Sequence, residues 1–369
     1  MARLRITGIV VFRANIPLVA PFRIALGVIS EARSLFVRVD TDAGICGWGE
    51  TSPVSQITGE TQAMSDAAAA DLAKLLLGSD PLDIEGRVAE MGRSLAFNSG
   101  VRSAFDMALY DVTGKAAGLP LYALLGGGKR PLETDQTIGL DVSEAMAEKA
   151  AVLARMGVPA IKVKLGTSAE EDLGRIARIR EAVGSELPLR IDANQGWDFP
   201  TAVRVLSRLQ SAGIEYCEQP LARWDLDNFR RLRERVSIPI MADESVFDHH
   251  DAFRLAASGC CDYLNIKLAK AGGIHTALKI DAVAEAASAR CMLGCMMESR
   301  LGLTAAAHLA CARPNIRYLD LDGHLQLRQD PIVGGGRWQG GTITLPDDPG
   351  IGATVDPAFL SSCEQTTFR

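Results

Sequence analysis

The 369-residue sequence lacks the features that mark several classes of protein. It contains no run of about 18 apolar residues, so a membrane-spanning helix is not expected. Its formal net charge of −6 gives no basic face of the kind a nucleic-acid-binding protein needs, so no nucleic-acid partner is expected. Residues 1–9 alternate polar and apolar side chains, which is typical of a strand and unlike a signal peptide.

Paired metal-binding thiols and nucleotide-binding glycine motifs are also missing. The eight cysteines include no Cys-x-x-Cys pair, and several lie in apolar segments, as Cys217 does in IEYCE. We therefore expect reduced, buried thiols in a cytoplasmic protein rather than disulfides or a zinc site. The GGGK segment at 126–129 lacks P-loop spacing, so a tight turn is the favoured interpretation.

The first third of the chain has a different pattern from the rest. Strand-like segments at 4–14 and 34–50 flank a predicted loop at 17–32, and alanine-rich helical segments follow. Strands followed by helices predict an α+β domain over residues 1–125.

Over residues 126–322, short strands alternate with amphipathic helices. Polar residues end successive strands at intervals of 28, 26, 25 and 24 residues, each about one βα unit: Lys164, Asp192, Glu218, Asp243 and Lys267. Eight such strands predict a parallel βα barrel. A doubly wound sheet is the alternative, but its glycine fingerprint after the first strand is missing. Residues 323–369 are glycine-rich and lose the alternation, so we expect them to return to the N-terminal domain.

Three of these strand ends are acidic. Asp192 closes LRID, Glu218 closes EYCE and Asp243 closes PIMAD, so the three side chains point into one mouth of the barrel. Carboxylates from three elements suit Mg²⁺, which also keeps sites for water and substrate oxygen. Independent helix caps are the alternative interpretation of the three acids.

Lysines accompany the acids. Lys162 and Lys164 are two residues apart and therefore leave the same face of their strand. A solvated strand face is the ordinary interpretation of such a pair, but apolar neighbours and the predicted metal favour proton transfer. Lys267 would face Lys164 across the mouth. Two lysines on either side of a metal-bound carboxylate indicate abstraction and return of an α-proton through a metal-stabilised enolate.

The sequence resembles a known family over nearly its full length. It is similar to the enolase superfamily, in its muconate-lactonising-enzyme-like subgroup. The matching motifs are KVK (162–164), DANQGW (192–197), EQP (218–220), ADES (242–245), NIKLAKAGG (265–273) and MES (297–299). The resemblance implies a (β/α)₇β barrel under an α+β cap built from both chain ends, and a homo-oligomer.

The resemblance also implies roles for the residues. Mg²⁺ would be held by Asp192, Glu218 and Asp243, with Lys164 and Lys267 as the two acid/bases. Lys162 would touch the substrate carboxylate and lower the pKa of Lys164.

The end of the eighth strand, LDLDG, points to a substrate class. Asp320 and Asp322 share a face of the strand and would suit a substrate with a free ammonium group. Dipeptide epimerases of the subgroup carry such a DxD motif for the N-terminal amine, and TDQT, which ends at Thr137, also resembles them. A turn before Gly323 is the alternative role for the aspartates.

We therefore expect an isomerase that inverts the α-carbon of the C-terminal residue of a dipeptide. Relatives that act on Ala-Glu carry a cap arginine where this chain has Gly27, which puts an acidic second residue in doubt. Cys295 and Met297 indicate a pocket that tolerates apolar groups. The alternatives are a cycloisomerase, an o-succinylbenzoate synthase, an N-acylamino acid racemase, or an inactive barrel that serves as a scaffold.

Overall fold

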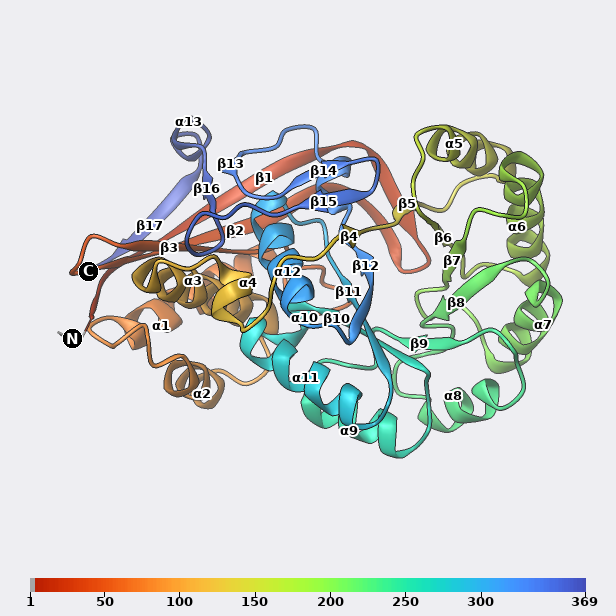
Figure 1. The fold of residues 1–369 in the computed structure, drawn as a ribbon, viewed down its shortest axis with the longest axis horizontal. Helices are drawn as coiled ribbons and strands as arrows, with labels where there is room; N and C mark the ends of the chain where they lie inside the picture. Colours follow the sequence, from red (N-terminus) through yellow and green to blue (C-terminus); the bar gives the residue numbers. More distant parts are fainter. Residues whose placement is uncertain (1–3) are drawn as a thin grey trace.

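Eight parallel strands form the central sheet of the computed structural model, which describes residues 4–369 (Figure 1). Their order is β12-β11-β10-β9-β8-β7-β6-β5. The sheet nearly closes into a barrel, because the Asp135 N–H beside β5 donates to Leu319 O of β12 at 3.2 Å. The strands are β5 (Gln136–Ile138), β6 (Ile161–Lys164), β7 (Leu189–Asp192), β8 (Ile214–Glu218), β9 (Ile240–Ala242), β10 (Tyr263–Lys267), β11 (Arg290–Gly294) and β12 (Ile316–Asp320).

Helices connect successive strands and cover the outside of the barrel (Figure 1). They start where side chains satisfy free backbone N–H groups: Ser168 and Glu171 form a capping box, and Asp198 accepts from Thr201 N–H at 2.9 Å. The helices are α5 (Ser143–Arg155), α6 (Ala169–Val183), α7 (Phe199–Leu209), α8 (Leu226–Arg233), α9 (His249–Ala257), α10 (Leu268–Ala271), α11 (Ile274–Ala286) and α12 (Arg300–Ala312).

A second, antiparallel sheet forms the core of the cap, with the order β17-β1-β2-β3. Helix α3 packs closely on β3, because a Cβ at Gly49 would lie only 1.8 Å from Ala104 O. Its elements are β1 (Ile6–Ile24), β2 (Gly27–Thr41), β3 (Cys46–Thr51) and β17 (Glu364–Phe368), with α1 (Gln62–Leu76), α2 (Ile84–Ser94), α3 (Ser99–Ala117) and α4 (Leu121–Leu124).

The C-terminal tail completes the cap. Strand β17 pairs with β1, from Phe368 opposite Ile9 to Glu364 opposite Arg13. The remaining short elements are β4 (Leu132–Glu133), η1 (Gly323–Gln326), β13 (Ile332–Gly334), β14 (Arg337–Gln339), β15 (Thr342–Thr344), β16 (Ala353–Val355) and α13 (Pro357–Leu360). Thus the predicted (β/α)₇β barrel with an α+β cap from both chain ends is confirmed, whereas the boundaries at 125 and 322 stay predictions.

The predicted loop at 17–32 is wrong. Strand β1 continues to Ile24 and β2 begins at Gly27, so the two strands form one long hairpin that reaches the barrel near β5 (Figure 1). The register shifts between Pro17 and Phe22, and this irregularity accommodates Pro17 and Pro21, which cannot donate to a sheet. The hairpin therefore brings cap residues to the mouth of the barrel.

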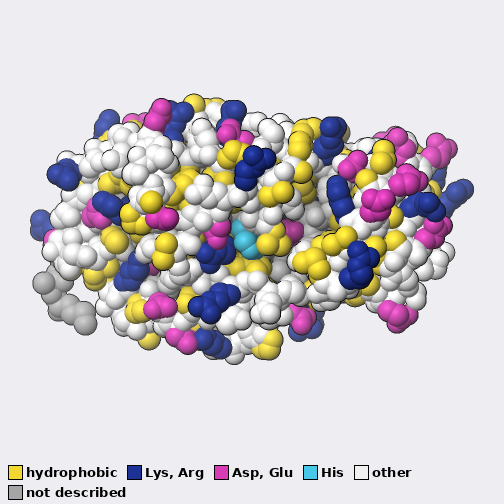
Figure 2. Space-filling model, turned by 90° about the horizontal axis from the view of Figure 1, so that it is seen from above, with side chains coloured by type: hydrophobic (Ala, Val, Ile, Leu, Met, Phe, Trp, Pro, Cys, Tyr) yellow, Lys and Arg dark blue, Asp and Glu magenta, His cyan; other side chains and the backbone are white. Residues whose placement is uncertain are grey.

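Two surface properties bear on the partners expected from the sequence. Acidic and basic side chains are intermixed over the face drawn in Figure 2, so this face carries no basic patch. In the part of the chain from residue 4 onward, no helix combines the length and apolar character needed to cross a membrane.

Candidate active site

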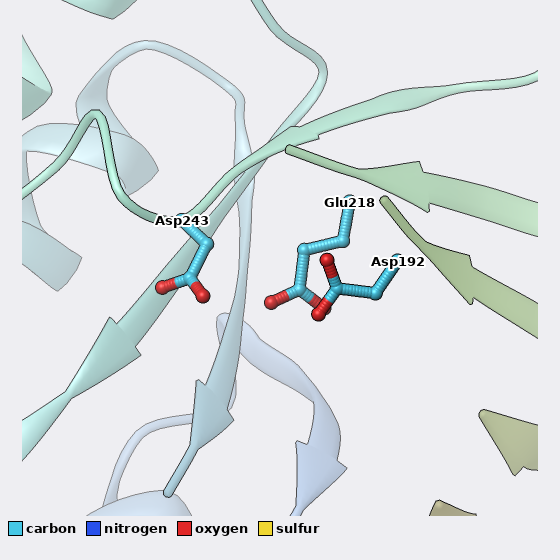
Figure 3. Close-up of side chains that lie close together, drawn as sticks. All are labelled: Asp192, Glu218 and Asp243. Atoms are coloured by element: carbon cyan, nitrogen blue, oxygen red, sulfur yellow. The ribbon is translucent and has the colours of Figure 1, made fainter. Parts of the chain in front are cut away.

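Three carboxylates meet at the carboxyl ends of neighbouring barrel strands. Asp192 ends β7, Glu218 ends β8 and Asp243 directly follows β9, so the parallel strand order brings the side chains to one point. Their ligand oxygens lie within 4.8 Å of one another, and all three residues are fully buried. Figure 3 shows the carboxylates turned toward a common centre. The structure thus brings the predicted metal ligands together.

Buried oxygens beside this triad lack hydrogen-bond donors. Within residues 4–369 these oxygens are Asn194 Oδ1, Glu244 Oε2 and Asn265 Oδ1. In the triad itself, Glu218 Oε2 and Asp243 Oδ1 form ion pairs with lysine ammonium groups. An unpaired buried oxygen costs free energy, so the set is suited to a bound cation. The candidate metal ligands are all oxygen atoms, with no imidazole or thiolate among them. Such a set fits Mg²⁺ better than zinc.

Lys162 and Lys164 extend from β6 into the same cluster. Lys164 Nζ donates to Asp192 Oδ2 at 2.5 Å. Lys162 Nζ donates to Asp320 Oδ2 at 2.6 Å and lies 2.7 Å from Glu218 Oε2. Burial opposes the charge of Lys162, but these carboxylates outweigh it and hold the pKa of Lys162 well above its usual range.

The carboxylates of the triad titrate differently from one another. Burial, and then the charge of Asp192, raises the pKa of Glu218 to about 8. Burial acts in the same direction on Asp192, but Lys164 and Lys162 outweigh it, so the pKa of Asp192 is lowered. Glu218 is therefore the member of the triad that holds a proton most readily near neutral pH.

Asp243 is held by two lysines from the other side of the barrel. Lys267 Nζ donates to Asp243 Oδ2 at 2.8 Å, and Lys270 Nζ forms an ion pair with Asp243 Oδ1. Burial would raise the pKa of Asp243, but both ammonium groups outweigh burial and leave it well below its usual value. Burial lowers and Asp243 raises the pKa of Lys267, and the net result is a raised value.

The pKa values of Lys162 and Lys267 are thus both raised. The cause is that each of these lysines contacts a buried carboxylate, which stabilises the charged form. A divalent cation on the same carboxylates would weaken this stabilisation.

The two aspartates of LDLDG lie at the edge where β12 meets β5. Thr137 N–H donates to Asp322 Oδ2 at 2.6 Å, and Thr137 Oγ1 lies 3.3 Å from Asp320 Oδ1. Burial, and then Asp320, raises the pKa of Asp322 to about 7. Asp320 has a pKa lowered to about 2, because Lys162 and Lys164 outweigh its burial. Asp322 bonds across to β5 with its side chain, which differs from the local turn bonding considered as an alternative.

Most of the predicted site residues line one cavity. The space between its walls is about 580 Å³, part of which is open to solvent. The predicted residues that line it are Thr137, Lys164, Lys267, Cys295, Met297, Asp320 and Asp322. Lys162 is not among the lining residues and lies beneath them, fully buried between carboxylates.

Buried carboxylates of the cap fix it to the barrel. Glu50 of β3 accepts from Ser299 N–H at 2.8 Å and from Gly302 N–H at 3.0 Å, at the start of α12. Asp106 of α3 accepts from Ile274 N–H at the start of α11. Acids at helix N-termini are favourable, so these contacts hold the cap over the mouth of the cavity.

Sequence reasoning missed residues that surround the triad. Lys270 donates to Asn265 O at 3.1 Å and to Val246 O at 3.2 Å in addition to its contact with Asp243. Asn194 donates to Glu244 Oε1 at 3.2 Å. Each of these residues lies inside or directly beside a motif already recognised, and that adjacency was the available signal.

Comparisons with known proteins agree with this geometry. Residues 6–126 match the family described as mandelate racemase/muconate lactonizing enzyme, N-terminal domain, and residues 145–359 match the enolase C-terminal domain-like family.

Two curated relatives are similar over most of their length. A hydrophobic dipeptide epimerase of Enterococcus faecalis is 42% identical, with 90% of this chain and 94% of the relative covered. An L-Ala-D/L-Glu epimerase of Clostridium acetobutylicum is 39% identical, with 94% and 98% covered.

Among solved structures, a dipeptide epimerase of Cytophaga hutchinsonii complexed with Mg and D-Ala-L-Val superposes with a TM-score of 0.98. It is 40% identical and covers 99% of this chain and 100% of that chain.

Proposed function

The chain belongs to the enolase superfamily, in the mandelate racemase/muconate lactonizing enzyme family, and from this premise we propose that it is a Mg²⁺-dependent dipeptide epimerase. One observation carries the proposal. The acid pair Asp320 and Asp322 opens into the same cavity as Lys164 and Lys267, so one ligand can contact all four. A dipeptide has the ammonium group that the acids need and the α-proton that the lysines need.

Asp192, Glu218 and Asp243 would hold the metal. When bound there, Mg²⁺ supplies Lewis-acid stabilisation of the negative charge that develops on the substrate carboxylate as the α-proton leaves. The protein's own part is to provide an oxygen-only, fully buried set of ligands.

Lys164 and Lys267 would exchange protons with the α-carbon of the C-terminal residue. They extend from β6 and β10, on opposite sides of the barrel mouth, and both line the cavity. One neutral lysine takes the proton from one face and the other, as an ammonium, returns a proton to the opposite face, which inverts the centre. The pair ends with the protonation states exchanged, so the reverse reaction uses the same groups.

Asp322 and Asp320 would bind the N-terminal ammonium group. Asp322 is fixed by the 2.6 Å hydrogen bond from Thr137 N–H, which leaves its other oxygen for the ligand. An ammonium-to-carboxylate hydrogen bond at a buried site orients the dipeptide and thereby sets which α-carbon lies between the lysines.

Hydrogen exchange in D₂O tests the proposal. With Mg²⁺ present, a library of L,L-dipeptides should exchange the α-hydrogen of the second residue and yield the L,D epimer, measured by mass spectrometry and ¹H NMR. Replacement of both lysines by alanine should abolish exchange in a folded protein. Exchange of N-acylamino acids, with none for any dipeptide, would instead favour the racemase activity named for a 32% identical relative, the N-succinyl-L-Arg/Lys racemase of Bacillus cereus.

A further inference from the structure

The residues that line the cavity indicate which side chains a bound ligand can have. Apart from the polar groups already described, the lining is dominated by apolar side chains that form two separate clusters. The first wall consists of Phe22, Ile29 and Met297, and the second wall consists of Val54, Ile57 and Met296.

The first wall adjoins the acid pair. A Cβ at Gly139 would lie 3.2 Å from the ring of Phe22, and Gly139 is only two residues beyond Thr137, the partner of Asp322. Phe22 and Ile29 pack against the cluster that contains Met297. A residue whose ammonium group is bound at Asp322 therefore places its side chain toward the first wall.

The second wall adjoins Lys267. Ile57 and Met296 pack with Ala269, which is two residues beyond Lys267, and Val54 packs against the same cluster. A residue whose α-carbon lies beside Lys267 therefore places its side chain toward the second wall. The two walls belong to separate hydrophobic clusters that line one cavity, so each can contact a different side chain of a dipeptide.

Neither wall offers a charge to a ligand. The charged residues that line the cavity are Lys164, Lys267, Asp320 and Asp322. The proposed function already assigns each of them to proton transfer or to ammonium binding. Gly27 at the hairpin has a φ of +145°, so a larger side chain at this position would be strained. A charged side chain of the ligand would be desolvated against either wall without a partner.

We infer that the substrate, on the basis of the proposed epimerase function, is a dipeptide whose two side chains are both uncharged and apolar. The first side chain contacts Phe22, Ile29 and Met297, and the second contacts Val54, Ile57 and Met296. Each methylene added to fill an apolar pocket changes kcat/KM by about 10-fold or more, so bulky pairs are favoured over Ala-Ala.

Matched dipeptides test this inference with the full-length protein and Mg²⁺. Leu-Leu is compared with Leu-Glu, Leu-Lys, Glu-Leu and Lys-Leu in the D₂O exchange assay. We expect kcat/KM for Leu-Leu to exceed that of every charged dipeptide by about 100-fold or more. Equal or faster exchange of any charged dipeptide overturns the inference and leaves the epimerase function standing. Absence of exchange for every dipeptide overturns both.

Two variants test the assignment of each wall. Ile29→Ala should lower kcat/KM for Leu-Ala at least 10-fold more than for Ala-Leu, and Ile57→Ala should do the reverse. Val28→Ala is the matched control, because Val28 neighbours Ile29 but is 53% exposed on the other face of β2. An equal loss for both dipeptides in both variants would overturn the assignment of the walls.

Discussion

Replacement of Asp322 by asparagine separates a dipeptide epimerase from the other activities of the family. The amide oxygen of the Asp322→Asn side chain can still accept the hydrogen bond from Thr137 N–H, so the fold at the β5–β12 edge is kept. The variant loses only the negative charge offered to an ammonium group. Asp320 compensates for that charge only in part, because its Oδ2 already accepts from Lys162 Nζ at 2.6 Å.

The size of the effect follows from the interaction that is lost. A hydrogen bond to a charged group contributes about 1.5–3 kcal/mol, which corresponds to a loss of about 10- to 150-fold in kcat/KM for dipeptides. An N-acylamino acid lacks the ammonium group and should lose little. The assay is the α-hydrogen exchange rate of wild type and Asp322→Asn with both substrate classes. An equal loss for both classes would refute the assignment of Asp322 to the ammonium group.

The pH dependence gives a second readout of the same residue. Burial and the neighbouring Asp320 raise the pKa of Asp322 to about 7, so the free enzyme loses the carboxylate as the pH falls below about 7. The kcat/KM of the wild type for dipeptides should therefore fall with decreasing pH below 7, and Asp322→Asn should lack this limb. The stability of the folded state depends on pH in the opposite direction to kcat/KM. A raised pKa in the folded state means that stability present below pH 3.8 is lost as the pH rises through 7, and the variant should not show that loss.

Three further outcomes are expected. Lys164→Ala and Lys267→Ala should each slow epimerisation by about 10²- to 10⁴-fold while each still exchanges the α-hydrogen of one stereoisomer, and an identical stereochemical course in both variants would contradict two separate bases. Mg²⁺ binding at pH 7 should release a proton, because burial and Asp192 raise the pKa of Glu218 to about 8, and titration calorimetry in buffers of different ionisation enthalpy would detect it. Asp106→Ala should lower the free energy of unfolding by about 1–3 kcal/mol, since Ile274 N–H loses its buried acceptor, whereas Asp106→Asn should cost less; equal urea denaturation midpoints would contradict this.

The barrel could be predicted from the sequence because its strands repeat at the length of a βα unit and end in polar residues. The same reason explains why the three acids Asp192, Glu218 and Asp243 lie close together. The carboxyl ends of parallel strands all lie at one mouth of the barrel. The spacing within a strand was equally informative for Lys162 and Lys164, which both reach the carboxylate cluster.

The cap hairpin could not be predicted in the same way. Residues 17–32 contain Pro17 and Pro21, which usually end strands, and the pairing depends on an irregular register that no local pattern records. The walls that this hairpin contributes, Phe22 and Ile29, were therefore missed as lining residues. Lys270 was missed for a different reason, because a lysine on a short helix is ordinarily solvated and its burial depends on Asp243 from another strand.

The charges around the triad suggest why a lysine can act as a base here. Four buried lysines directly contact four buried carboxylates: Lys162, Lys164, Lys267 and Lys270 with Asp192, Glu218, Asp243 and Asp320. The carboxylates that contact Lys162 and Lys267 keep both of these lysines charged.

A divalent cation on Asp192, Glu218 and Asp243 would add positive charge to this buried site and displace the proton that Glu218 holds near neutral pH. Loss of a proton from one lysine and entry of the substrate carboxylate would each reduce the excess of positive charge. These are the two changes that the proposed reaction requires before an α-proton can move, so metal binding would favour both the neutral lysine base and the bound substrate.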